Sequence, residues 1–168
     1  MRRMLLALAI AAGTLVAACG AASEEPSFSF LPPDDPRVAA ATAEARHHLP
    51  VFWRMHDQSP PGYDQFALKV SLPTVEHEAF EHIWVTAIRR DERSVTGKLA
   101  NVPVDLGDLV VGSQVTFSPE QISDWQYQKD GRLYGHFVTR AVMADFSPAE
   151  RAELDSVLAP EPLEAGVQ

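Results

Sequence analysis

The stretch Gln121–Arg140, QISDWQYQKDGRLYGHFVTR, holds one Trp, two Tyr, one Phe and one His within twenty residues. Asp130-Gly131 separates two strand-like runs, Ile122–Lys129 and Arg132–Val142. This dipeptide is among the strongest signals for a two-residue type I′ turn, in which both residues have positive φ. The stretch therefore predicts an antiparallel hairpin.

A two-residue turn also predicts the register of this hairpin. The expected pairs are Lys129 with Arg132, Tyr127 with Tyr134, Trp125 with His136 and Ser123 with Val138. Because side chains alternate along a strand, one face should carry Trp125, Tyr127, Tyr134, His136 and Arg140, and the other Ile122, Asp124, Leu133, Gly135 and Phe137. A bulge would shift part of this assignment.

We call the first of these two faces the aromatic face, and two interpretations of it stay open. Aromatic cross-strand pairs commonly stabilise a sheet, so the face can pack beneath a helix. Alternatively it is a binding surface, because hydroxyl, indole, imidazole and guanidinium groups converge there.

Helix signals flank the strands. Asp35 can cap a helix that has Pro36 in its first turn, and Val38, Ala41, Ala45 and Leu49 recur at helical spacing. Pro50 interrupts this helix or starts a new turn. Near the C-terminus, Ser147 and Glu150 form a capping box for a last helix.

Four further strands are expected before the hairpin, at residues 66–70, 82–88, 95–100 and 114–117. The predicted fold is α+β: an N-terminal helix on a bent, mainly antiparallel sheet of five to six strands, with a C-terminal helix. A small SH3-like barrel is the alternative arrangement of the sheet.

The N-terminus has the pattern of an export signal. Arg2 and Arg3 precede a short apolar run from Met4, and small residues follow it up to Cys19. This order is typical of a secretory signal peptide, and the run is too short for a stable membrane span.

Cys19 is the only cysteine of the chain and directly follows Val16-Ala17-Ala18. The arrangement resembles the bacterial lipobox, in which the thiol is acylated and the chain is cut before it. An ordinary signal peptide with an incidental cysteine is the alternative. Several acyl chains anchor a protein stably, and Gly20, in place of the Asp that retains lipoproteins at the inner membrane, favours the outer membrane.

These features predict four segments. They are a signal peptide at 1–18, the lipidated Cys19 with a flexible tether at 19–34, one domain at 35–159 and a disordered tail at 160–168. The protein would then be lipid-anchored in the cell envelope and face the periplasm.

Charge and cysteine content restrict the function. The chain has a formal charge of −9, and loss of Arg2 and Arg3 would leave 12 basic against 23 acidic side chains. This balance opposes binding to nucleic acid. A lone cysteine allows no disulfide within the chain.

Several short motifs then occur in a fixed order. They are Glu81-His82-Ile83-Trp84-Val85, Gly97-Lys-Leu-Ala-Asn101-Val-Pro103, Gly112–Phe117, Ile122-Ser-Asp124-Trp125 and Gly135-His-Phe-Val-Thr139-Arg140. Over residues 36–143 this pattern resembles the YegJ-like family, domain of unknown function 2314. The resemblance implies a small α+β domain and the hallmark positions Glu81, His82, Trp84, Asn101, Asp124, Trp125 and Arg140. It implies no reaction.

Candidate chemistry is limited to two groups of residues. His77, Glu78 and His82 could form a loop site for zinc or copper, although the spacing differs from the helical His-Glu-x-x-His motif. Glu81, His82, Asp124 and Arg140 could supply acid and base groups to a small periplasmic enzyme. The non-functional alternatives are an acidic surface loop for the first group and structural ion pairs for the second.

The sequence most favours a non-catalytic domain, tethered to the membrane, that binds an envelope protein or a cell-wall component through the aromatic face. An enzyme using the acid and base residues and a metal-binding protein using the His77–His82 loop remain the alternatives. No cofactor is predicted.

Overall fold

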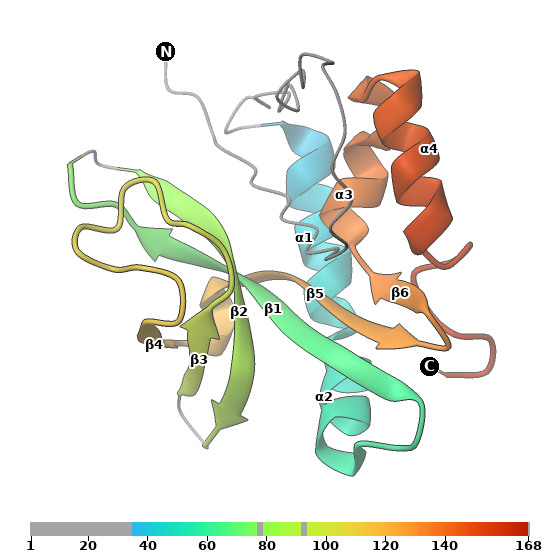
Figure 1. The fold of residues 1–168 in the computed structure, drawn as a ribbon, viewed down its shortest axis with the longest axis horizontal. Coiled ribbons are helices and arrows are strands. Elements are labelled where there is room, and N and C mark those ends of the chain that lie inside the picture. The colour runs from blue at the N-terminus through green and yellow to red at the C-terminus, as the bar shows by residue number, and fades with distance from the viewer. Residues whose placement is uncertain (1–34, 77–78, 92–93, 168) are drawn as a thin grey trace, which may run out of the picture.

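The computed structural model describes residues 35–76, 79–91 and 94–167 and confirms the α+β class (Figure 1). In chain order the elements are α1 (Pro36–His47), α2 (Leu49–Gln58), β1 (Tyr63–Pro73), β2 (Phe80–Arg90), β3 (Val95–Leu99), β4 (Gln114–Phe117), η1 (Pro119–Gln121), β5 (Ile122–Lys129), β6 (Arg132–Gly135), α3 (Phe137–Val142), η2 (Met143–Asp145) and α4 (Pro148–Val157). The predicted signal peptide, Cys19 and the tether, residues 1–34, lie outside the described residues. Within the described ranges, every helix is too short or too polar to span a bilayer.

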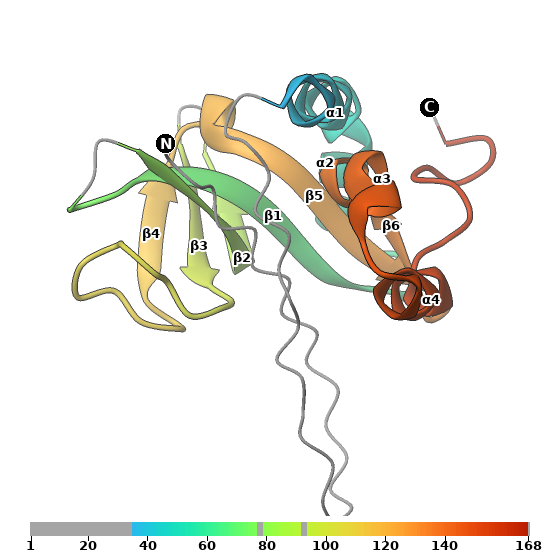
Figure 2. The same ribbon diagram turned by 90° about the horizontal axis from the view of Figure 1, so that it is seen from above.

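The six strands in the described ranges form one antiparallel sheet with the order β4-β3-β2-β1-β5-β6. β4 and β6 are its two end strands and do not pair with each other, so the sheet is open and the alternative of an SH3-like barrel is wrong. Figures 1 and 2 show that the long strands β1 and β2 twist strongly. The β3–β4 half therefore turns away from the β5–β6 half, beside which all four α-helices gather.

The helix starts follow the sequence signals. The Asp35 side chain accepts a hydrogen bond of 2.8 Å from the backbone N–H of Arg37 and caps α1. Pro50 lies in the first turn of the separate helix α2. Ser147 and Glu150 exchange the two hydrogen bonds of a capping box at the start of α4.

α1 and α2 cover one face of the sheet, and Trp125 and Tyr127 of the predicted aromatic face pack beneath them. The Trp125 indole N–H donates to the backbone oxygen of Ala45 at 2.8 Å. The Trp125 ring lies 5.9 Å from Phe52 and stacks on Tyr127 at 5.7 Å, between ring centroids. These three aromatic side chains are fully buried. Trp125 and Tyr127 are therefore core residues, which decides between the two interpretations of the aromatic face at these positions.

The predicted hairpin turn is confirmed. Asp130 has φ 50° and Gly131 has φ 76°, as a type I′ turn requires. Lys129 pairs with Arg132 and Tyr127 with Tyr134, in the predicted register.

The predicted second strand of the hairpin, residues 132–142, is wrong beyond Gly135. Gly135 has φ 79°, and a Cβ added there would lie 2.1 Å from the backbone oxygen of Trp125, so no other residue fits without a shift of the backbone. His136 follows with φ 55°, and α3 starts at Phe137. Trp125 and His136 therefore do not pair as predicted, and Arg140 is a helical residue.

A bulge lies at the start of β5. Lys69 pairs with Asp124, whereas Val70 pairs with Ile122, so Ser123 is an extra residue. The bulge places Ile122 on the same side as Trp125, contrary to the predicted alternation. Asp124 stays on the opposite side, as predicted.

The predicted disordered tail is wrong for residues 160–167. The backbone oxygen of Pro162 accepts from the Gly135 N–H at 2.8 Å. The Glu164 carboxylate accepts from the hydroxyls of Tyr63 and Tyr127 at 2.9 and 3.0 Å and pairs with Lys129. The composition of the tail is that of a loop, but its partners lie on β1 and β5, which local sequence does not indicate.

Candidate functional site

One face of the central strands carries polar side chains that the core does not explain. Lys69 on β1 is the register partner of Trp84 on β2 and of Asp124 on β5, so these side chains leave the sheet on the same side. Their neighbours Leu68, Val85 and Trp125 point to the opposite, apolar side. We call Lys69, His82, Trp84, Asp124 and His136 the polar row.

Asp124 fixes the start of α3. Its carboxylate accepts hydrogen bonds of 2.9 to 3.1 Å from the backbone N–H groups of Trp125, Phe137 and Val138. Burial raises the pKa of Asp124 to about 6, and these donors and the charge of Lys69 oppose that rise. The carboxylate therefore acts as a cap that joins β5 to α3.

His136 lies between β6 and α3 in the left-handed region, at φ 55° and ψ 39°. Its ring lies 5.2 Å from the Trp84 ring, and it is 3% exposed. Both ring nitrogens are buried and have no hydrogen-bond partner among the described residues. Burial, together with the charges of Lys69 and Arg140, lowers the pKa of His136 to about 3, so the imidazole is neutral.

Lys69 is a buried cation, only 2% exposed. Its Nζ lies 5.4 Å from the centroid of the Trp84 ring, within the range of a cation–π contact. Burial lowers the pKa of Lys69 to about 8, whereas Asp124 raises it. Asp124 is the acidic residue of the polar row and the register partner of Lys69. Among the ion pairs of the described residues, none within 4.0 Å joins Lys69 to Asp124.

The hydrogen bonds of His82 define its tautomer. The Ser123 hydroxyl donates to the backbone oxygen of Lys69 at 3.2 Å, so its lone pair accepts from His82 Nδ1 at 2.9 Å. The proton is then on Nδ1, and Nε2 is the free base nitrogen. Burial, with the charges of Lys69 and Arg46, lowers the pKa of His82 to about 4.

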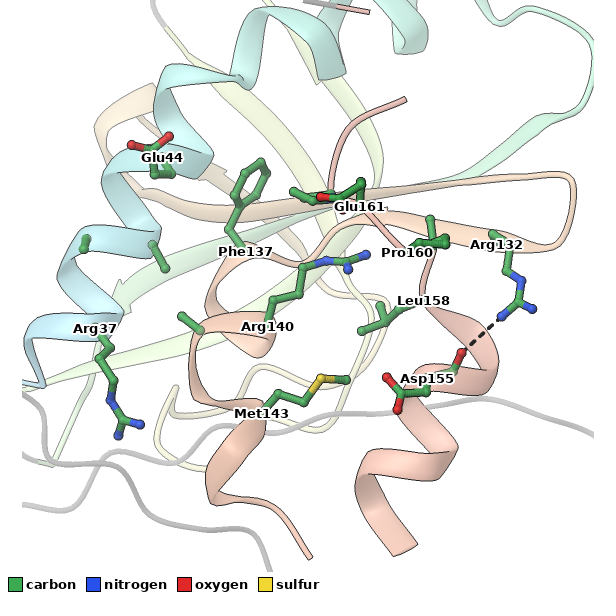
Figure 3. A pocket seen from close by; sticks show the side chains of 15 residues that line it. Arg37, Glu44, Arg132, Phe137, Arg140, Met143, Asp155, Leu158, Pro160 and Glu161 are labelled. Atoms are coloured by element: carbon green, nitrogen blue, oxygen red, sulfur yellow. Dashed lines mark hydrogen bonds between the residues drawn. The ribbon is translucent and has the colours of Figure 1, made fainter. Parts of the chain in front are cut away.

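A cleft of about 830 Å³ lies between α1, α3, α4 and the segment after α4 (Figure 3). Its apolar lining includes Ala40, Ala41, Phe137, Ala141, Met143 and Leu158, and its charged lining consists of Arg37, Glu44, Arg132, Arg140, Asp155 and Glu161. The cleft thus offers three cations and three anions around an apolar wall.

Arg140 reaches into the middle of this cleft, between Phe137 and Leu158 (Figure 3). Its guanidinium donates to the backbone oxygens of Gly135 at 2.9 Å and Leu133 at 3.4 Å, which leaves further N–H groups for a ligand. Burial lowers the pKa of Arg140, and the carboxylates of Glu161 and Asp124 counteract this.

The other cleft arginines are held at the rim. Arg37 pairs with Asp35 and Asp145, both at 2.7 Å. Arg132 donates to the backbone oxygens of Asp155 and Ser156.

The residues of the predicted aromatic face do not form one surface. Trp125 and Tyr127 are core residues, and Tyr134 stacks on Tyr127 with ring centroids 5.5 Å apart. His136 belongs to the polar row, because the chain turns at Gly135. Arg140 lines the cleft.

The remaining hallmark positions are structural. Glu81 accepts from the backbone N–H groups of Val104 and Asp105 at 2.8 to 3.1 Å, and Asn101 Oδ1 accepts from Trp84 N–H at 3.2 Å. These bonds fix the loop between β3 and β4. Strand alternation places Glu81 and Asp124 on opposite sides of the sheet, so they form no carboxylate pair.

The metal hypothesis is only partly covered by the structure. His77 and Glu78 lie outside the described residues, and His82 belongs to the polar row. Within the ranges that are described, no group of three or more His, Cys, Asp or Glu side chains is placed to hold a metal.

Lys69 is the site residue that the sequence reasoning did not single out. The signal was a lysine within the otherwise apolar strand Phe66–Val70.

Comparisons with known proteins agree with the motif pattern. A family model described as an uncharacterised protein conserved in bacteria, DUF2314, matches residues 35–159. The uncharacterised protein YegJ of Escherichia coli K12 is 27% identical over 95 residues, which cover 56% of this chain and 61% of that protein. A putative ankyrin repeat protein of Neisseria meningitidis serogroup B is 33% identical over 79 residues, 47% of this chain and 31% of that protein.

The matched segments span less than two thirds of either relative. No solved structure matches the chain. The family model extends from the cap of α1 to the residues after α4 and so includes the polar row and most of the cleft. The chain therefore belongs to the DUF2314 family of uncharacterised proteins conserved in bacteria.

Proposed function

We propose that this protein is a non-catalytic binding domain of the cell envelope and that the cleft beside Arg140 is its binding site. The observation that carries the proposal is the cleft itself: about 830 Å³ in volume, with a partly buried arginine directed into an apolar lining. Pockets of this size and mixed lining are the usual form of ligand sites.

The lining favours a peptide as the ligand. A peptide combines apolar side chains, charged groups of both signs and backbone groups, and the cleft offers Phe137 and Leu158 for the first and three cations and three anions for the second. An envelope protein or the peptide part of the cell wall supplies such a segment. A highly charged polyanion fits less well, because the acidic residues of the lining would repel it.

The structural hydrogen bonds of Asp124 and Glu81 support binding rather than catalysis. The Asp124 carboxylate caps α3 and the Glu81 carboxylate holds the loop between β3 and β4. Neither carboxylate lines the cleft. Acid–base catalysis by these two carboxylates would need them close to the ligand.

A tether completes the proposal. Acylation of Cys19 would anchor the protein, and residues 20–34 would separate the domain from the membrane by roughly 20 Å. The domain would then meet its ligand in the periplasm, at the outer membrane.

In-cell photocrosslinking from a probe amino acid at Met143 tests the cleft. We expect a discrete adduct with an envelope protein or a cell-wall fragment, because Met143 lines the cleft. A probe at Gln114, exposed on β4, is the matched control position. Ala40→Trp should reduce the Met143 adduct at least fivefold by filling the cleft. An adduct that forms equally from Gln114, or that Ala40→Trp does not change, would contradict the proposal, as would the absence of any adduct.

The tether has its own test. Cys19→Ala should move the protein from the membrane fraction to the soluble fraction, because the acyl chains can no longer be attached. Retention of the variant in the membrane fraction would overturn lipid anchoring and leave the cleft proposal untouched.

A further inference from the structure

The polar row contains more buried polar groups than the described part of the chain satisfies. Both ring nitrogens of His136 lack a hydrogen-bond partner in the described part of the chain, although the residue is only 3% exposed. Buried polar groups are almost always hydrogen-bonded, and an unsatisfied one destabilises the fold. A bound molecule that supplies hydrogen bonds would remove this cost.

The cation of the same region also has no direct partner among the described residues. Lys69 is 2% exposed, and its ammonium group lies over the Trp84 ring and makes no hydrogen bond or ion pair within the described ranges. Asp124 is its register partner, but both carboxylate oxygens of Asp124 already accept from backbone N–H groups. Buried charges are normally paired, so a further anion bound next to Lys69 would supply the partner that its ammonium group lacks.

The backbone conformation of His136 also indicates a ligand site at the polar row. His136 holds a left-handed conformation, which is uncommon for residues other than glycine. Such conformations concentrate at ligand sites, where the surrounding structure enforces them. Here Asp124 enforces it, because its carboxylate binds the two backbone N–H groups that follow His136.

We propose that the polar row binds the oxyanion group of a small ligand, a carboxylate or a phosphate, with Lys69 Nζ and an N–H of His136 as donors and the Trp84 ring as one wall. A metal cation is the wrong ligand here, because the Lys69 charge repels it. The site is distinct from the cleft of the proposed function, since none of the five residues of the polar row lines that cleft.

The test is a titration of the full chain, labelled with ¹⁵N in its histidines, with inorganic phosphate and, separately, with acetate. The probe is the ring ¹⁵N shift of His136, assigned by loss of its signals in His136→Asn. Sodium chloride at equal ionic strength corrects for screening. We expect a saturable shift with at least one of the two anions, and the anion that saturates at lower concentration identifies the preferred group.

Lys69→Met and Lys98→Met form a matched pair of variants. Lys69→Met removes the buried ammonium and keeps an unbranched apolar side chain, whereas Lys98 is exposed on β3. The anion concentration at the midpoint of the titration should rise at least tenfold in Lys69→Met and stay the same in Lys98→Met. If Lys69→Met does not fold, His136→Asn serves instead, with tryptophan fluorescence as the readout and the same tenfold rise expected.

Two results would overturn the proposal. The first is the absence of saturation with both anions, which would mean that water alone satisfies His136. The second is an unchanged midpoint in Lys69→Met or in His136→Asn, which would place the anion elsewhere.

Discussion

His136 shows how one residue can be costly to the fold and still be held in place. Its backbone is left-handed, and its ring nitrogens have no hydrogen-bond partner among the residues that the structure describes. Burial and the nearby cations Lys69 and Arg140 disfavour its charged form. Asp124 and the bond from His136 N–H to the Trp125 oxygen, 3.0 Å long, fix its position. These costs make His136 the residue at which the pH dependence of stability should be tested.

We predict that His136→Asn makes folding less sensitive to acid. The pKa of His136 is about 3 in the folded protein and about 6.5 in the unfolded chain, so below pH 6.5 the unfolded chain binds a proton that the folded protein excludes. Stability is therefore complete above pH 6.5 and is lost as the pH falls towards 3. Asn tolerates the left-handed backbone and does not titrate.

Between pH 7 and pH 5 the variant should lose roughly 2 kcal/mol less unfolding free energy than the original protein. Urea unfolding followed by circular dichroism at several pH values measures this difference. Parallel stability curves for the two proteins would show that His136 is not the group responsible.

At the scale of elements, the hairpin between β5 and β6 is the part of the fold most directly encoded. Asp130 and Gly131 both have positive φ, and a Cβ added at Gly131 meets no atom within 4 Å. The cost of replacing them is therefore conformational rather than steric.

We predict that Asp130-Gly131→Ala-Ala lowers the unfolding free energy by about 1–3 kcal/mol, because alanine is strained at both positions. Thermal and urea unfolding measure the loss. Asp130→Asn is the control, since asparagine suits a type I′ turn and should leave stability within about 0.5 kcal/mol. Equal stability of the double variant and the original protein would contradict the turn assignment.

The elements also show where sequence reasoning stops. The caps at Asp35 and Ser147 and the turn at Asp130-Gly131 were predictable because their chemistry is local. The end of β6 was not, because it depends on the approach of Gly135 to Trp125 and on the bonds from α3 to Asp124, ten or more residues away. The bulge at Ser123 likewise shows only in the pairing of β5 with β1.

The candidate sites were less predictable than the fold for the same reason. The hallmark positions His82, Trp84 and Asp124 were identified, but not that they surround Lys69. The cleft includes residues after Ala159, in a segment that composition alone indicates to be disordered. Only tertiary structure brings α1, α3 and this segment together.

At the scale of the whole molecule, the segment after α4 returns to the sheet and binds the start of β1 and the last residues of β5. Glu164 accepts from Tyr63 at the start of β1 and from Tyr127 in β5, and pairs with Lys129. Leu163 and Val167 pack against the main core.

We predict that deletion of residues 160–168 lowers the unfolding free energy by about 2–4 kcal/mol. The buried hydroxyl of Tyr127 would lose its acceptor, and apolar contacts would be lost with it. Urea unfolding of the truncated chain measures the loss. Glu164→Gln, which keeps an acceptor but removes the charge, should cost less, about 1 kcal/mol. A truncated chain as stable as the original would show that the segment is dispensable.

The same segment has a consequence for engineering. Leu133 O and Gly135 N–H, on the side of β6 away from β5, are bound by Ala159 N–H and by the Pro162 oxygen. These bonds close an edge that would otherwise be a template for strand addition by another copy. A fusion partner attached directly after α4 would reopen this edge and favour aggregation of the chimera. A partner attached after Val167 would leave the edge sealed.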